Sequence, residues 1–138
     1  LREMAKLNVP VIAIITGEGC SGGALGLAVA DKVFLLEHAY YTVISPEGCA
    51  SILWRDATKA ADAADALKIT AKDLMKFNII DGEIKEPVGG AHTNYEEVSA
   101  NMKKTILDSI DELLKLPVEN LKEQRYQKFR KMGAFLEG

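Results

Sequence analysis

Residues 16–26, with the sequence TGEGCSGGALG, hold the residue types in this chain that are best suited to chemistry. Glycine has no side chain, so consecutive glycines let a ligand oxygen approach backbone N–H groups without obstruction. Where Gly22 and Gly23 open a helix, their N–H groups lie at its positive end and stabilise an oxygen that gains negative charge. One such donor contributes roughly 10²–10³ in rate. The stretch therefore predicts an oxyanion-binding turn at these two glycines.

The same stretch also fits the GxGxxG template of dinucleotide-binding folds. Gly17, Gly19 and Gly22 would form the turn. Glu37 stands twenty residues beyond Gly17, where such folds carry a ribose-binding acid. A doubly wound domain needs further strand-helix repeats, whereas the sequence after residue 44 has a mostly helical pattern. The dinucleotide interpretation is kept as an alternative.

A third template, the GxSxG nucleophile elbow of hydrolases, is matched by Gly19, Ser21 and Gly23. Asp81 and His92 follow in the chain order that such a hydrolase uses. Both partners lie close together around one loop, and hydrolases of that class have far longer chains. This alternative is also kept, and for His92 we otherwise expect a role in the hydrogen bonding of the loop.

The elements around the glycine stretch must position it. Residues 11–16, VIAIIT, are apolar on both faces and predict a buried strand of a parallel sheet. Residues 22–30, GGALGLAVA, predict a helix that packs closely against the sheet, with Gly26 allowing the close approach. Strands are expected over residues 33–36 and 40–44. Together these segments predict a β-turn-α-β unit.

The next segment, SPEGCASILW at residues 45–54, predicts a helix. Ser45 is the expected N-cap, Pro46 suits the first turn, and Glu47 is favoured at the positive end. We expect the helix to be buried through its apolar residues 52–54. These preferences explain Glu47 by capping and dipole, and leave a catalytic role for it open.

Further helices are expected downstream. Residues 59–67 and 71–77 predict two short helices, the second opened by Thr70 with Asp73 three residues later and closed by Asn78. A short strand over residues 81–84 and a turn-rich loop follow.

A capping box of Thr93 and Glu96 then predicts a long helix that ends before Pro117. Its apolar stripe is formed by Val98, Met102, Ile106, Ile110 and Leu113. Residues 118–132 predict a last, charged helix that is solvated or faces another subunit. Its basic residues are Lys122, Arg125, Lys128, Arg130 and Lys131.

Composition limits the classes of function. The chain has 138 residues, 48% hydrophobic and 27% charged, as expected for one globular domain. Its net charge of -3 does not favour nucleic acid as a partner. The longest apolar run is too short to span a bilayer and no signal segment is seen, so we expect a cytoplasmic protein without membrane contact. Cys20 and Cys49 have no paired spacing, so no metal is expected, and both are taken as small buried residues.

Four motifs carry a resemblance to a known family: GEGCSGGALGLAVADKV, SPEGCASILW, EPVGGAH and EQRYQKFRKMG. Together, over essentially the whole chain, they resemble the alpha subunits of bacterial and plastid acetyl-CoA carboxylase carboxyltransferase. SPEGCASILW is specific to that family, whereas the Gly-Gly helix start is shared with the wider crotonase-like superfamily. Cys20 departs from the glycine usual in the family. Because the family's subunit is longer on the N-terminal side, we expect this chain to be its C-terminal part.

The resemblance implies an α/β, crotonase-like fold of stacked β-β-α units with a helical C-terminal region. Residues 1–138 would be one carboxyltransferase domain lacking its N-terminal part, with residues 94–138 as its helical segment. The implied reaction passes carboxyl from carboxybiotin to acetyl-CoA, giving malonyl-CoA for fatty acid biosynthesis in an ATP-dependent complex. Biotin would arrive on a separate carrier protein. The other implied partner is a zinc-bearing beta subunit in an alpha-two beta-two assembly.

The resemblance also assigns residues. Gly22 and Gly23 are the implied catalytic residues, whose N–H groups would bind the ureido oxygen of biotin. Gly19, Ser21 and Glu47 are the expected cofactor-binding residues, although Ser21 is equally explained as a helix cap. Two competing functions remain: a crotonase-like acyl-CoA hydratase or isomerase with Glu47 as acid or base, and a non-catalytic assembly fragment.

Overall fold

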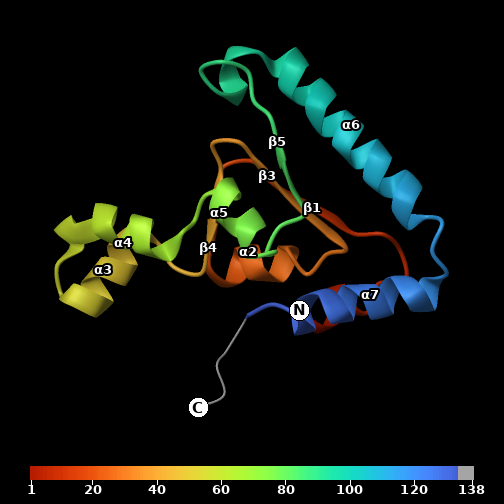
Figure 1. Ribbon diagram of the computed structural model, residues 1–138, viewed down its shortest axis with the longest axis horizontal. Coiled ribbons are helices and arrows are strands. Elements are labelled where there is room, and N and C mark those ends of the chain that lie inside the picture. Colours follow the sequence, from red (N-terminus) through yellow and green to blue (C-terminus); the bar gives the residue numbers. More distant parts are fainter. Residues whose placement is uncertain (134–138) are drawn as a thin grey trace.

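The computed structural model describes residues 1–133 and is built around a parallel sheet with strand order β1-β3-β5 (Figure 1). The strands are β1 (Ile12–Ile15), β3 (Lys32–Leu36) and β5 (Gly82–Ile84). Strands β1 and β3 are parallel, and Ile14 of β1 pairs with Phe34 of β3. Parallel strands need crossover connections, and the segment between β1 and β3 contains the predicted glycine-rich turn and helix. The expected α/β class is confirmed.

A second, shorter parallel pair joins β2 (Glu18–Cys20) to β4 (Tyr40–Thr42). The sequence did not predict β2, because three residues around a glycine give no strand pattern. Only glycine fits at position 19, because a Cβ there would lie 2.9 Å from Cγ2 of Ile15. The pair therefore brings the start of the glycine-rich turn close to β4.

The helix after the turn, α2 (Ser21–Leu27), is shorter and more exposed than predicted. Leu25 and Leu27 are exposed, and a Cβ placed on Gly26 would meet nothing within 4 Å. The expected close packing at Gly26 is therefore wrong. β1 is also only half-buried along its length, because it is an edge strand of the sheet.

Helix α3 (Pro46–Trp54), a short 3-10 turn η1 (Ala57–Lys59) and α4 (Ala60–Leu67) form a helical hairpin that extends away from the sheet (Figure 1). The predicted cap is confirmed, since the hydroxyl of Ser45 accepts a hydrogen bond from the N–H of Gly48 at 3.1 Å.

The expected burial of residues 52–54 is wrong. Ile52 and Leu53 are 72% and 65% exposed. The reason is that α3 turns its other face, with Cys49 and Ala50, toward Ala63 of α4. An apolar surface is left open at the end of α3.

The remaining elements largely follow the sequence. These are α1 (Arg2–Ala5), α5 (Ala71–Lys76), the 3-10 turn η2 (Ala91–Thr93), α6 (Tyr95–Leu113) and α7 (Val118–Arg130). Thr70 caps α5 as predicted, and Asn78 follows that helix with a left-handed φ of 56°.

The start of α6 differs from the prediction by one residue. Asn94 is the N-cap and accepts a hydrogen bond from the N–H of Glu97 at 3.1 Å. Thr93 does not serve, because it belongs to η2 and its hydroxyl donates to the carbonyl of Gly90 at 2.7 Å. The capping pair is therefore Asn94 with Glu97, not Thr93 with Glu96.

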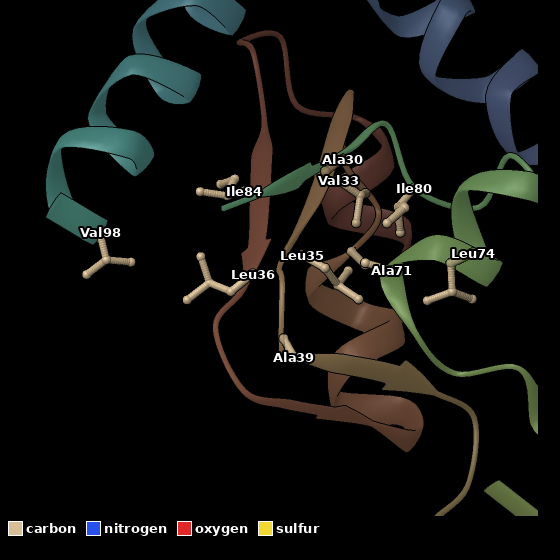
Figure 2. Close-up of a cluster of buried hydrophobic side chains, with 11 residues drawn as sticks. Ala30, Val33, Leu35, Leu36, Ala39, Ala71, Leu74, Ile80, Ile84 and Val98 are labelled. Carbon is tan, nitrogen blue, oxygen red and sulfur yellow. The ribbon is translucent and has the colours of Figure 1, made fainter. Parts of the chain in front are cut away.

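The core lies between the sheet, α5 and α6 (Figure 2). Leu35 and Val33 of β3 are its largest fully buried side chains. The predicted stripe of α6 packs toward β5, with Val98 and Leu113 buried and the three residues between them half-buried. Figure 2 shows Val98 beside Ile84 and Leu36 of the sheet.

The last helix is more than a solvated surface. Arg125 of α7 is 2% exposed, and its guanidinium donates to both carboxylate oxygens of Asp31, at 2.9 and 2.7 Å. It also donates to the carbonyls of Met4, Leu7 and Val9. The expectation of a solvated or subunit-facing helix is therefore wrong for this face of α7, because the partner of Arg125 lies 94 positions away.

Within residues 1–133, none of the helices is both long and apolar enough to cross a membrane. Residues 134–138 of the predicted helical segment 94–138 lie outside the described residues.

Candidate functional site

The turn between β2 and α2 combines local strain with open access. Ser21 has a left-handed φ of 62°, a conformation that costs a residue with a Cβ roughly 1–2 kcal/mol. Ser21, Gly22 and Gly23 are all exposed. A Cβ on either glycine would meet nothing within 4 Å. Packing among residues 1–133 therefore does not require glycine at either position.

The N–H groups of this turn are available to a ligand. Backbone N–H groups in the first turn of a helix have no partner within that helix. The N-cap residue of α2 is Cys20, and no side-chain cap bond is made there within the part of the chain that the structure describes. Gly22 and Gly23 thus present donors at the positive end of a helix.

A cavity of about 960 Å³ lies beside the turn. Its lining is mainly apolar and comes from separate parts of the chain. It includes Ser21, Gly22 and Leu25 of α2, residues 41–43 at the end of β4, Leu74 and Phe77 at α5, and Phe129 and Met132 at the end of α7. Burial raises the pKa of the Tyr41 phenol, so this lining residue stays protonated at neutral pH. No local pattern in the sequence marks these residues as walls of a cavity.

Of the five predicted site residues, three lie in the turn at this cavity and two lie outside the cavity lining. Ser21 and Gly22 line the cavity, and Gly23 follows them in the same exposed turn. Gly19 is buried and does not line it. Glu47, in the first turn of α3, does not line it either. The structure brings the first three together, whereas Gly19 lies on β2 just before the turn and Glu47 lies on α3.

Glu47 belongs instead to a group of polar side chains around Tyr40. The pKa of the Tyr40 phenol is raised by burial and by a hydrogen bond with Glu18. The charges of Glu18, Cys20 and Glu47 raise this pKa further. Glu18 and Tyr40 face each other in the β2–β4 pair, so this group borders the strand that carries the turn.

The residues of the dinucleotide alternative have other partners. Glu37, the candidate ribose-binding acid, accepts a hydrogen bond from Lys85 at 2.9 Å and another from the N–H of Glu86 at 3.3 Å. The bond from Lys85, followed by that from Glu86, lowers the pKa of Glu37. These contacts give Glu37 a structural role where β3 ends.

The residues of the hydrolase alternative are also placed elsewhere. Asp81 accepts from the N–H of Val33 at 2.6 Å and pairs with Lys128. His92 is exposed in η2. Neither residue lines the cavity beside Ser21, so the geometry does not supply Ser21 with a base.

A charged cluster that the sequence reasoning missed lies where β3 and β5 end. Glu86 accepts hydrogen bonds from the N–H of His38 at 2.6 Å, the N–H of Ala91 at 2.8 Å and Nδ1 of His38 at 2.9 Å. Desolvation opposes ionisation of Glu86, but these bonds outweigh it and lower its pKa. Hydrogen bonds with Glu83 and Glu37 raise the pKa of Lys85 to about 12. The cluster holds the loop before α6 to the sheet.

No cluster of three or more histidine, cysteine or acidic side chains suited to a metal occurs among residues 1–133. Cys20 is half-buried and Cys49 buried, and both are free thiols.

Comparisons with known proteins agree on one family. The model of the family described as acetyl co-enzyme A carboxylase carboxyltransferase-like matches residues 1–133. A similar relative is an acetyl-coenzyme A carboxylase carboxyl transferase subunit alpha from Protochlamydia amoebophila, 56% identical over all of this chain and 44% of the relative. Another of the same name, from Geobacter metallireducens, is 57% identical over 99% of this chain and 43% of the relative. The chain spans less than half the length of these relatives.

Solved structures show the fold. Transcarboxylase 12S superposes on 80% of this chain and 21% of its own, with a TM-score of 0.63 and 18% identity. An enoyl-CoA hydratase from Mycobacterium avium subsp. paratuberculosis superposes on 94% of this chain and 53% of its own, with a TM-score of 0.55 and 18% identity. These likenesses confirm the expected crotonase-like fold.

Proposed function

The chain belongs to the acetyl co-enzyme A carboxylase carboxyltransferase-like family, and from that premise we propose that it carries the biotin-facing part of a carboxyltransferase site. The proposed reaction moves carboxyl from carboxybiotin to acetyl-CoA and gives malonyl-CoA for fatty acid biosynthesis. Biotin comes on a separate carrier protein, and the whole complex is ATP-dependent and cytoplasmic.

The observation that supports this proposal most directly is the open approach to the N–H groups of Gly22 and Gly23. Both glycines are exposed, and a Cβ at either position would meet no atom within 4 Å apart from the neighbouring residues and the backbone of α2. The two N–H groups would hold the ureido oxygen of biotin and would stabilise negative charge on it. Carboxybiotin, when bound, supplies the carboxyl group. The left-handed φ of Ser21 fixes the direction in which these donors point.

The other predicted site residues act around this turn. The hydroxyl of Ser21 is placed to orient the bound group, since Ser21 lines the cavity. Gly19 supports the turn, because only glycine fits between Ile15 and the β4 backbone. Glu47, in the first turn of α3, lies outside the cavity lining and adds negative charge near Tyr40.

The proposed partners follow from the name that the relatives carry, which describes a subunit alpha. A zinc-bearing beta subunit binds the CoA thioester, and two copies of each subunit form the assembly. The hydratase alternative has less support, because a likeness of 18% identity to an enoyl-CoA hydratase shows the fold alone.

The test is malonyl-CoA decarboxylation, the reverse half-reaction, with free biotin and a matching beta subunit. Gly22→Pro removes one N–H donor at a position in the first helical turn where no intrahelical bond is lost. We expect turnover to fall by roughly 10²–10³ while the complex still assembles. Gly26→Ala in the same helix is the control and should retain turnover, because its Cβ meets open space. Undiminished turnover of an assembled Gly22→Pro complex would refute the proposal.

A further inference from the structure

We propose that the cavity beside the Ser21–Gly22 turn is a binding site for an aliphatic carboxylate, with the last turn of α7 as one of its walls. This site goes beyond carboxyl transfer, since it concerns a ligand that is not a substrate; because it shares the Ser21–Gly22 turn with the proposed function, the bound carboxylate would compete with biotin. The lining, the charge and the anchoring of α7 each support one part of the inference.

The residues that line the cavity favour a ligand with an aliphatic chain. Leu25, Val43 and Phe77 border the cavity and are 48%, 75% and 57% exposed. Phe129 and Met132 add apolar surface from α7. The volume of about 960 Å³ is at the upper end of small-molecule sites. Covering these side chains with a hydrocarbon chain removes apolar surface from water.

The charged side chains of the cavity lining favour a ligand with an anionic group. The described lining contains two lysines, Lys76 and Lys131, and no aspartate or glutamate, although the chain as a whole has a net charge of -3. The amine of Lys76 lies 3.8 Å from Asp73, a long and weak pairing. Lys131 takes part in no salt bridge within residues 1–133. Among the described lining residues, a carboxylate would therefore meet two positive side chains and no negative one.

The α7 wall is held by anchors on its other side. Lys128 donates to the carbonyl of Asp31 at 3.2 Å and pairs with the carboxylate of Asp81. Arg125, one turn earlier, binds the carboxylate of Asp31. Phe129 directly follows Lys128, so these anchors fix where the wall stands. Lys128 is therefore a positioning residue for the cavity.

The inference and the proposed function have separate tests. Ser21 and Gly22 belong to the cavity as well as to the turn, so a bound carboxylate would lie against the N–H donors. Its binding is measured without turnover, and it stands or falls independently of decarboxylation.

The experiment titrates this chain with a dansyl-labelled undecanoate and then displaces the probe with decanoate or with decanol. We expect saturable binding, and decanoate should displace the probe at lower concentration than decanol. Removing both lysines with Lys76→Met and Lys131→Met should reduce that preference by roughly tenfold, since each exposed ion pair contributes up to about 1 kcal/mol. Lys122→Met is the matched control on α7, because Lys122 pairs with Glu119 and does not line the cavity.

Lys128→Met tests the positioning of the α7 wall separately from the charge of the lining. We expect weaker binding of both decanoate and decanol while the circular dichroism spectrum stays that of the parent chain. The proposal is overturned by non-saturable binding, by equal displacement with decanoate and decanol, or by a loss in the Lys122→Met control as large as that in the double variant. Unchanged binding in a folded Lys128→Met chain would remove α7 positioning from the proposal.

Discussion

Replacing Arg125 with methionine should destabilise the chain by about 3–5 kcal/mol, the range found when one partner of a buried ion pair is removed. Arg125 makes five hydrogen bonds, two to Asp31 and three to backbone carbonyls of residues 4–9. The side chains of Arg125 and Asp31 are 2% and 3% exposed, so water does not replace the lost donors. Methionine fills similar space, which leaves the unpaired carboxylate as the main cost.

A second substitution separates charge from packing. Asp31→Asn, added to Arg125→Met, keeps an oxygen that can accept from the N–H of Val11, now 2.7 Å from the carboxylate. It removes the uncompensated charge, and we expect the double variant to recover about 1–2 kcal/mol.

The assay is urea unfolding at neutral pH, followed by far-ultraviolet circular dichroism. Lys122→Met is the control on the same helix, and its exposed pair with Glu119 should contribute less than about 1 kcal/mol. The reasoning would be refuted if Arg125→Met stayed within about 1 kcal/mol of the parent, or if the double variant were no more stable than the single one.

Three further predictions concern the carboxylate cluster, the strained turn and the glycines. The pKa of Glu86 is lowered in the fold, so its carboxylate stabilises the fold fully above the unfolded-state pKa, and this stabilisation is lost as pH falls through the lower folded-state pKa. In acid unfolding, Glu86→Gln should therefore lose less stability over that pH range than the parent chain. Ser21→Gly should raise the melting temperature slightly, because glycine adopts the left-handed φ without strain, and a drop of several degrees would contradict this. Gly19→Ala should cost about 1–3 kcal/mol through its contact with Ile15, whereas Gly26→Ala should be neutral or stabilising; equal effects in urea unfolding would show that the assigned packing is wrong.

Local patterns predicted the elements whose causes lie within a few residues. Ser45 before Pro46 and Thr70 before Asp73 both mark helix starts, because a cap needs only its own first turn. The apolar stripe of α6 was also visible, since it depends on helical spacing alone.

Features that depend on distant partners were not visible. Arg125 has the pattern of a solvated residue on a charged helix, and only Asp31 explains its burial. Trp54 and its neighbours have the pattern of a core, yet the hairpin turns them outward. Burial is decided by what packs on an element, and the local sequence of that element does not contain this information.

The candidate site stays a prediction, but part of its geometry could be recognised from the sequence. Ser21 and Gly22 line the cavity, and a glycine turn before a helix indicates an anion-binding site by its residue types alone. The cavity walls, such as Phe77 and Phe129, come from helices far along the chain and carry no mark of their position. A turn can be recognised from its residues, while a cavity is defined only by the fold.

The contacts that hold α7 also affect the order in which parts of the chain fold. Arg125 lies 116 to 121 positions from the carbonyls that it binds at Met4, Leu7 and Val9. Contacts of such high sequence separation slow folding, because a long loop must close before they form. A ribosome makes residues 4–9 well before Arg125, so this segment waits without its partner while the sheet assembles. Residues 4–9 can therefore make these contacts only after α7 has emerged.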